Sequence, residues 1–307
     1  MSTHATHLPG NRLRTLMNEG CVGLPGAYNG LVARQAATIG FDGLYVSGAA
    51  VTASFGVPDI GMLSLTEFCN VIYQVTVASG LPVLCDADTG FGESEITRRA
   101  VAEYHRAGAA GFHIEDQVFP KRCGHLDGKT LVSIDHFQEK VAAAASARDD
   151  LTDGSFVVCA RTDAYGVDGM DATIERAKAY VDAGADMLFP DGMRTESDYA
   201  TFAEALRNYT GGSSRREPYL LAIMTEFGKT EMISLDRFAE LGYHCVIWPV
   251  SSLRITMHAV REGLQAIRDA GSPEPVLERM QTRKDLYELL RYTPGQEWSF
   301  PSAIDKG

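Results

Sequence analysis

Short apolar runs alternate along this chain with longer stretches in which apolar residues recur at helical spacing. The apolar runs are nearly continuous, which is typical of parallel β-strands that are buried on both faces. From this pattern we predict eight strands, whose first residues lie near Cys21, Gly43, Pro82, Gly111, Phe156, Met187, Tyr219 and Cys245.

The stretches between these strands predict amphipathic helices. Ser133 is a candidate N-cap for a helix in which Phe137 and Val141 share one face. Asp171 is a candidate N-cap for another helix, which we expect to end at Gly184. Eight strand–helix units in 307 residues predict a (β/α)8 TIM barrel of the α/β class. An open, doubly wound sheet is the alternative, but no Gly-x-Gly-x-x-Gly motif opens the first helix, which weighs against a dinucleotide-binding version.

The domain organisation follows from the same pattern. We interpret residues 1–307 as a single barrel domain with a helical extension that begins at about residue 271. Residues 280–290 predict one helix outside the barrel, and residues 207–218, which contain several Gly and Ser, predict a flexible loop.

Charge and cysteine usage narrow the possible partners. The chain has 28 Lys and Arg against 40 Asp and Glu, a net charge of -12 at pH 7. This acidity argues against nucleic acid or an anionic membrane as a partner, and no apolar run approaches the roughly 18 residues of a membrane span. The six cysteines are scattered without a Cys-x-x-Cys pair, which favours a reducing compartment without a disulfide framework. We therefore expect a cytoplasmic protein.

One cysteine lies in an unusually charged setting, the run Lys121-Arg122-Cys123-Gly124-His125. Nearby positive charge lowers the pKa of a thiol from roughly 8.5 and makes it useful in proton transfer. Lys121, Arg122 and His125 are the candidate sources of that charge, and Gly124 leaves room for a substrate carboxylate beside the backbone. The alternative is a charged surface turn that happens to contain a cysteine.

Polar residues collect where the predicted strands end. The active site of a (β/α)8 barrel is built at the carboxyl ends of its strands, so we expect these side chains to face one another. The residues concerned are Tyr45, Ser47, Gly48, Asp86, Asp88, Glu115, Asp116, Arg161, Asp163, Asp191, Thr225, Glu226 and Arg254.

Asp86 and Asp88 are separated by one residue, so on a strand they would share a face. Two adjacent carboxylates repel each other unless a cation joins them, and hard oxygen ligands with open water positions suit Mg2+ or Mn2+. Glu115, one strand away, is a candidate to complete the site directly or through water. The alternative makes Asp88 a helix N-cap and Asp86 a buried hydrogen-bond acceptor.

Arg161 and Arg254 lie at strand ends, where an ordinary core needs no cation. An arginine fork suits a substrate carboxylate. The alternative for each is an internal salt bridge, for example between Arg161 and Asp163 or Asp191. The position of His113 on a predicted strand fits a core residue as well as a site residue.

Together these sequence motifs resemble those of the isocitrate lyase / phosphoenolpyruvate mutase superfamily, and the resemblance is strongest to its 2-methylisocitrate lyases. It runs from about Gly30 to Tyr287, and the cysteine run is specific for the lyase members. The matching phrases are Tyr45-Val-Ser-Gly, Val57-Pro-Asp-Ile-Gly61, Asp86-Ala-Asp-Thr-Gly-Phe-Gly92, His113-Ile-Glu-Asp-Gln117, Lys121-Arg-Cys-Gly-His125, Ala160-Arg-Thr-Asp-Ala164, Thr225-Glu-Phe-Gly228 and Met280-Gln-Thr-Arg283.

The resemblance implies a carbon–carbon lyase of a small polycarboxylate 2-hydroxy acid, in a homotetramer whose barrels exchange their last helix. It implies Mg2+ at Asp86 and Asp88, with Asp59 and Glu115 close by. We expect Cys123 to act as general acid and Tyr45 to be the candidate base, with Lys121 and His125 supporting the thiol. Sister lyases of isocitrate, dimethylmalate or oxaloacetate are the alternatives, as is a non-catalytic carboxylate-binding barrel. Substrate contacts are expected from Ser47, Gly48, Ala49, Gly124, Arg161, Asp191, Thr225, Arg254 and Arg283.

Three positions depart from the family pattern. Ala49 stands where the family commonly has Gly, Asp191 replaces a Glu, and Ile223 stands where an Asn normally reaches the substrate. Asp191 can still act through a bridging water. Ile223 cannot donate a hydrogen bond, so these departures affect the choice of substrate more than the reaction class.

Overall fold

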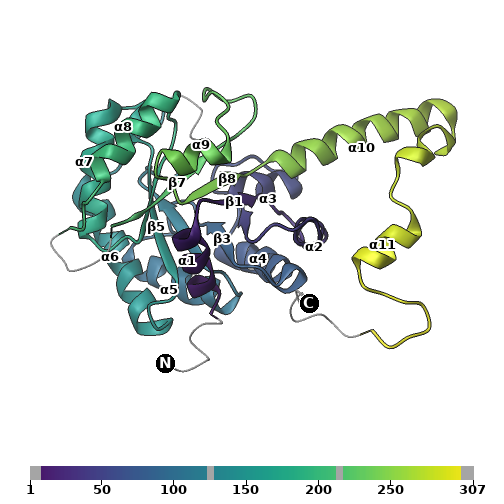
Figure 1. The fold of residues 1–307 in the computed structure, drawn as a ribbon, viewed down its shortest axis with the longest axis horizontal. Helices are drawn as coiled ribbons and strands as arrows, with labels where there is room; N and C mark the ends of the chain where they lie inside the picture. The colour runs from purple at the N-terminus through teal and green to yellow at the C-terminus, as the bar shows by residue number, and fades with distance from the viewer. Residues whose placement is uncertain (1–7, 123–127, 212–216, 299–307) are drawn as a thin grey trace.

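The protein is described by a computed structural model that covers residues 8–122, 128–211 and 217–298. Eight parallel strands form one sheet in the order β1-β8-β7-β6-β5-β4-β3-β2, and a bridge between Gly26 and Tyr45 joins β1 to β2. The chain is therefore a (β/α)8 TIM barrel, as predicted (Figure 1). Each strand begins at the predicted residue or one residue later. The strands are β1 (Val22–Pro25), β2 (Leu44–Val46), β3 (Val83–Asp86), β4 (Gly111–Glu115), β5 (Val157–Thr162), β6 (Met187–Pro190), β7 (Tyr219–Ile223) and β8 (Cys245–Trp248).

Helices alternate with the strands and surround them (Figure 1). They are α1 (Pro9–Glu19), α2 (Gly30–Ile39), α3 (Gly48–Ser54), α4 (Leu65–Ser79), α5 (Ser94–Arg106), α6 (Ile134–Leu151), α7 (Gly169–Asp182), α8 (Glu196–Leu206), α9 (Leu235–Glu240), α10 (Ser251–Ala270) and α11 (Arg283–Leu289), with short 3-10 segments at η2 (Ala164–Gly166) and η3 (Glu274–Arg279).

The two predicted N-caps have different outcomes. Ser133 caps α6, where its side chain accepts a hydrogen bond from the His136 N–H, and this prediction is confirmed. The prediction for Asp171 is wrong, because α7 begins earlier and its N-cap is Asp168. Asp171 instead lies in the first turn of α7, where a carboxylate interacts favourably with the helix dipole.

The core has two layers. Tyr45, Leu84 and Phe189 belong to a cluster inside the barrel, and α1 contributes Leu13 and Met17 to the same cluster. A larger cluster lies between the strands and the surrounding helices. The strands from β2 to β7 are thus buried on both faces, which is why their apolar runs are continuous in the sequence, whereas β1 is only partly buried.

In the last part of the described chain, α10 projects from the barrel (Figure 1), and α11, which follows it, contacts α2. None of the residues of α10 is buried. No helix in the described ranges has both the length and the apolar character needed to cross a membrane.

Candidate active site

A cavity of about 170 Å3 opens at the carboxyl ends of the strands, where the predicted site residues meet. It contains a tyrosine, carboxylates, a lysine and two arginines that come from widely separated parts of the sequence. The predicted residues that line it are Tyr45, Ser47, Ala49, Asp59, Asp86, Lys121, Arg161, Asp191, Ile223, Thr225, Glu226 and Arg254.

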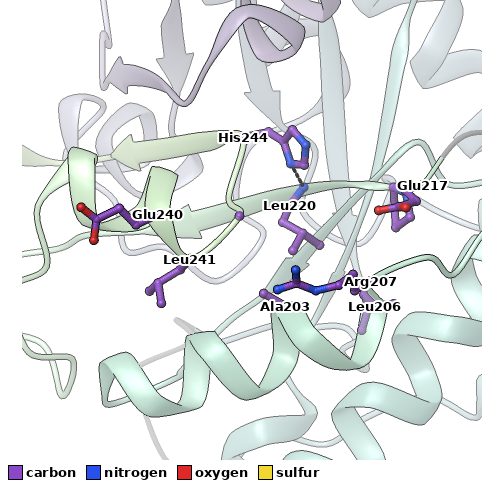
Figure 2. Close-up of a pocket in the computed structure, with 10 residues that line it drawn as sticks. Ala203, Leu206, Arg207, Glu217, Leu220, Glu240, Leu241 and His244 are labelled. Atoms are coloured by element: carbon purple, nitrogen blue, oxygen red, sulfur yellow. Dashed lines mark hydrogen bonds between the residues drawn. The ribbon is translucent and has the colours of Figure 1, made fainter.

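Two further cavities are larger but do not collect these groups. One of about 260 Å3 lies beside α8 and the first residues of β7 and β8, where the Leu220 N–H donates to Nδ1 of His244 (Figure 2). It is at the opposite end of the strands from the predicted site. Another, of about 620 Å3, lies beside Phe91, Phe119 and Lys140 and shares only Glu115 with the predicted set. We therefore assign the site by its chemistry rather than by cavity size.

The two predicted metal-binding aspartates are close together, but not for the predicted reason. Asp86 is the last residue of β3, whereas Asp88 lies beyond the strand with a φ of 46°. The chain turns there, and the Asp88 N–H donates to Oδ1 of Asp86 at 3.0 Å. A second backbone N–H, that of Gly48, donates to Oδ2 of Asp86 at 3.0 Å. A left-handed turn, which Asp tolerates, brings the carboxylates together in place of a shared strand face.

The structure bears on the alternative roles of Asp86 and Asp88 as a buried acceptor and a helix N-cap. Asp88 is not a helix N-cap, because the N-cap of α5 is Glu93. Asp86 is a buried hydrogen-bond acceptor, as that alternative proposed. Accepting two N–H groups also fixes the direction of its carboxylate.

Lys121 pairs with the acids of this site. Its Nζ lies 2.9 Å from Oδ1 of Asp88 and also contacts Asp59, and its side chain is only 3% exposed. Burial lowers the pKa of Lys121, but Glu115, Asp88, Asp86 and Asp59 raise it well above its usual value. An ammonium ion thus already lies beside the predicted metal-binding carboxylates.

The pKa values of the acids show how strongly these charges interact. Burial raises the pKa of Asp86, but His113, Lys121 and Arg161 outweigh it and lower that pKa. Burial, with the charge of Asp86, raises the pKa of Asp88 to about 6 although Lys121 opposes the shift. Asp86 is therefore charged at neutral pH, whereas the pKa of Asp88 lies closer to neutral pH.

The carboxylates of this site fit an Mg2+ ion that keeps several water ligands. The buried Glu115 carboxyl accepts no hydrogen bond, although its Oε2 lies 3.2 Å from Nη1 of Arg161, and Oδ1 of Asp88 accepts none, although Lys121 lies 2.9 Å from it. Within the described ranges no three His, Cys, Asp or Glu side chains form a cage for a metal. Mg2+ is commonly held by one or two carboxylates with several waters, so Asp86 and Asp88 suit it. Burial raises the pKa of Glu115 well above its usual value, which favours contact through water.

Arg161 is fixed by three carboxylates on the wall of the cavity. Its Nε and Nη2 donate to Asp163 at 2.9 and 3.0 Å, its Nη1 lies 3.2 Å from Glu115, and its Nη2 also contacts Asp191. The ring of Phe189 lies 5.2 Å from its guanidinium carbon. Both internal salt bridges proposed as alternatives are therefore present. They hold the guanidinium rigidly at the cavity, which a carboxylate-binding arginine also requires.

Tyr45 and His113 form a buried pair inside the barrel. The Tyr45 hydroxyl lies 2.7 Å from Nε2 of His113, which is itself 3.7 Å from Oδ1 of Asp86. Burial lowers the pKa of His113 to about 4. Burial and the charge of Asp86 raise the pKa of Tyr45 well above its usual value. His113 is therefore neutral and connected to the site.

The family model described as phosphoenolpyruvate phosphomutase matches residues 13–268. The chain belongs to this family. It is 51% identical to "Probable 2-methylisocitrate lyase 1" of Corynebacterium glutamicum over 88% of this chain and 84% of that protein. It is 42% identical to the 2-methylisocitrate lyase of Aeropyrum pernix over 92% of this chain and 88% of that protein. These relatives are named as 2-methylisocitrate lyases, and the chain is an enzyme of the lyase type.

Solved structures agree with this membership. The crystal structure of 2,3-dimethylmalate lyase superposes with a TM-score of 0.82 at 35% identity, covering 94% of this chain and 92% of that one. Oxaloacetate acetylhydrolase with 3,3-difluorooxalacetate gives a TM-score of 0.83 at 33% identity, covering 92% and 93%. Members of the phosphoenolpyruvate phosphomutase family that are named for different substrates therefore share this fold.

The remaining predicted residues of this family member fall into four groups. Ser47 caps α3 by accepting from the Ala50 N–H, and Gly48 begins that helix beside Asp86. Arg254 lies in the first turn of α10, where its Nη1 donates to the Glu226 carbonyl at 2.8 Å and its side chain remains 42% exposed. Arg283 begins α11, outside the barrel, and does not line the cavity. Cys123, Gly124 and His125 lie outside the described residues.

Two groups near the site were not singled out from the sequence. Phe189 was read only as part of a strand, and no local signal distinguishes it from a core residue. Lys129 is buried, and its Nζ lies 2.9 Å from Oδ1 of Asp163. A cation close behind the cysteine run was the available signal for Lys129.

Proposed function

We propose that this protein is a carbon–carbon lyase that cleaves 2-methylisocitrate into pyruvate and succinate. The observation that carries the proposal is the single cavity that combines Asp86, Lys121 and Arg161 at the carboxyl ends of the strands. We infer the substrate from the relatives named 2-methylisocitrate lyase, which are 38–51% identical to the chain. A polycarboxylate requires fixed cations, and this cavity has them.

Asp86 and Asp88 would hold Mg2+ together with water, with Glu115 contacting it through water. Bound there, Mg2+ would supply a Lewis acid for the substrate hydroxyl and the carboxylate beside it. Lys121 would limit the repulsion between Asp59 and Asp88 and so keep the carboxylates close together. Mn2+ has similar ligand preferences and is the alternative ion.

Arg161 and Arg254 would bind the substrate carboxylates. Arg161 is preorganised by its three carboxylates, whereas the half-exposed Arg254 lies at the mouth of the cavity. Asp191 would reach the substrate through water. The prior orientation of Arg161 lowers the entropic cost of ordering side chains when a ligand binds.

The proton steps involve Tyr45 and Cys123. The Tyr45 hydroxyl would take the proton of the substrate hydroxyl as it passes its own to His113, whose imidazolium would be stabilised by Asp86, 3.7 Å away. Its raised pKa keeps the phenol protonated until that moment. When the carbon–carbon bond breaks, Arg161 would stabilise the charge that develops beside a carboxylate of the succinate half. The Cys123 thiol would then protonate that carbon as general acid.

The proposal also includes a homotetramer in which neighbouring barrels exchange their last helix. Met257, Val260 and Leu264 recur at helical spacing on α10 and are 54%, 41% and 62% exposed, which a helix in water would not favour. A second copy would cover this face. In that assembly the Arg283 of one subunit would reach the cavity of another, because Arg283 does not line its own. A cytoplasmic location is part of the same proposal.

The substrate is tested by a panel of acids with Mg2+ and identification of the products. We expect 2-methylisocitrate to be cleaved with the highest kcat/KM, ahead of isocitrate, 2,3-dimethylmalate and oxaloacetate. Preferred cleavage of another acid would keep the reaction class and replace the substrate; Ile223 on the cavity wall is the residue that favours such an outcome. Tight binding without any product would support a carboxylate-sensing barrel and contradict the proposal.

A further inference from the structure

Lys129 is a buried cation that the proposed mechanism does not use. Its side chain is only 3% exposed, and its Nζ lies 2.9 Å from Oδ1 of Asp163, which is fully buried. A lysine ammonium is rarely placed in the interior unless a carboxylate pairs with it. The purpose of the pair should therefore be sought in what Asp163 touches.

Asp163 holds the guanidinium of Arg161. The oxygen that accepts from Lys129 also accepts from Nη2 of Arg161 at 3.0 Å, and its other oxygen accepts from Nε at 2.9 Å. The backbone N–H of Asp163 donates to Oδ1 of Asp116 at 3.0 Å, which fixes the residue from behind. Lys129 and Arg161 thus share one immobile carboxylate.

The charges around Arg161 explain why a second cation matters. Glu115, Asp163 and Asp191 all contact its guanidinium, so three carboxylates compete for one positive charge that a substrate carboxylate must also use. Lys129 satisfies part of the negative charge of Asp163. In agreement, Arg161 and Lys129 lower the pKa of Asp163 against the opposing effect of burial.

We propose that Lys129 is a positioning residue that, through Asp163, leaves the guanidinium of Arg161 available to a substrate carboxylate. This inference rests on the proposed function only in taking Arg161 as a carboxylate-binding residue. Lys129 itself need not touch the substrate. Losing its charge should strengthen the attraction of Asp163 for Arg161 and add net negative charge beside a site for anions.

The test replaces Lys129 with Met, Gln and Arg and measures both turnover of 2-methylisocitrate and binding of succinate, by calorimetry with Mg2+ present. We expect Lys129→Met and Lys129→Gln to raise KM and the succinate Kd by about tenfold or more, as expected when one member of a buried charge pair is truncated. Lys129→Arg should stay within about threefold of wild type. If Lys129→Met does not fold, Lys129→Gln, which is one atom shorter than lysine but keeps a hydrogen-bond donor, gives the answer.

A matched control separates this role from loss of packing. Arg148 is also a buried cation, 2.8 Å from Asp186, but it lies at the opposite end of the strands. Arg148→Met should lower thermal stability and leave KM and the succinate Kd unchanged. Asp163→Asn tests the route: in that background, Lys129→Met should add less than about twofold to KM.

The outcomes distinguish this inference from the proposed function. If wild type cleaves 2-methylisocitrate while folded Lys129→Gln keeps its KM and succinate Kd, Lys129 has no positioning role. If wild type does not cleave it but succinate binding responds to Lys129 as described, the inference stands and the substrate assignment is wrong. If Lys129→Met raises KM as much in the Asp163→Asn background as it does in wild type, the effect does not pass through Asp163.

Discussion

Replacing Gly48 with Ala places one methyl group against the carboxylate that we expect to hold the metal. A Cβ at this position would lie 2.7 Å from Oδ2 and 3.1 Å from Cγ of Asp86, and 3.5 Å from Oδ1 of Asp88. The backbone of Gly48 has no positive φ, so the effect would come from the contact and not from backbone strain. Asp86 must move away and weaken its hydrogen bond from the Gly48 N–H.

The size of the effect follows from the contact. Overfilling a well-packed site by one carbon costs about 1–3 kcal/mol, which corresponds to about 5- to 150-fold in an equilibrium constant. Without metal, the Asp86 side chain can rotate to relieve part of this strain. Alanine also favours the α3 helix by up to about 1 kcal/mol over glycine. We therefore expect most of the cost in Mg2+ affinity and little in the stability of the metal-free protein.

Calorimetric titration with Mg2+ and thermal melts with and without Mg2+ measure the two quantities. The control is Gly20→Ala, because a Cβ there meets nothing within 4 Å. Gly48→Ala should bind Mg2+ about 5- to 150-fold more weakly, and Mg2+ should raise its melting temperature less than that of wild type. Wild-type Mg2+ affinity in Gly48→Ala would refute the placement of the metal at Asp86.

Three further predictions follow from other parts of the site. Cys123→Ser should fold, bind Mg2+ and lose most turnover in a pyruvate-release assay, because a serine hydroxyl is a far weaker acid than a thiol; near-normal turnover would exclude the thiol from the proton step. The Asp88 pKa of about 6 predicts that Mg2+ affinity falls as the pH is lowered through 6, since the proton then competes with the metal; titrations between about pH 5 and 8 that show no such fall would contradict it. Arg161→Met removes a cation that three buried carboxylates share and should lower the free energy of unfolding in urea by about 3–5 kcal/mol, whereas Arg237→Met, which breaks an exposed pair with Glu196, should have a much smaller effect; equal losses would mean that the Arg161 cluster does not act as a buried charge network.

The barrel could be predicted because its cause is repeated along the chain. Most of the strands are buried on both faces, so they appear as continuous apolar runs whatever their neighbours are. The same reasoning placed Asp86, Arg161 and Asp191 at one end of the barrel, since parallel strands bring their carboxyl ends together. The start of α7 was missed because Asp171 and Asp168 are equally plausible caps by residue type, and only the backbone path decides between them.

The fine geometry of the site depends on contacts between distant segments, which periodicity cannot reveal. Asp88 turns off its strand in a left-handed conformation, although its spacing from Asp86 matched a strand face. Lys121 was predicted to act on the thiol, yet in the described chain it pairs with Asp59 and Asp88. Lys129 could be noticed in the sequence only as a cation close behind the cysteine run, because its partner Asp163 is remote in the chain. Each case requires knowledge of where another strand end lies.

The most direct test of the account is cleavage of 2-methylisocitrate in D2O with Mg2+, followed by NMR of the products. We predict pyruvate and succinate in equal amounts, with one solvent-derived deuterium per succinate, because the carbanion formed by bond cleavage takes its proton from an exchangeable acid. Succinate without deuterium would contradict proton delivery to that carbon, and the absence of both products would contradict the lyase reaction itself.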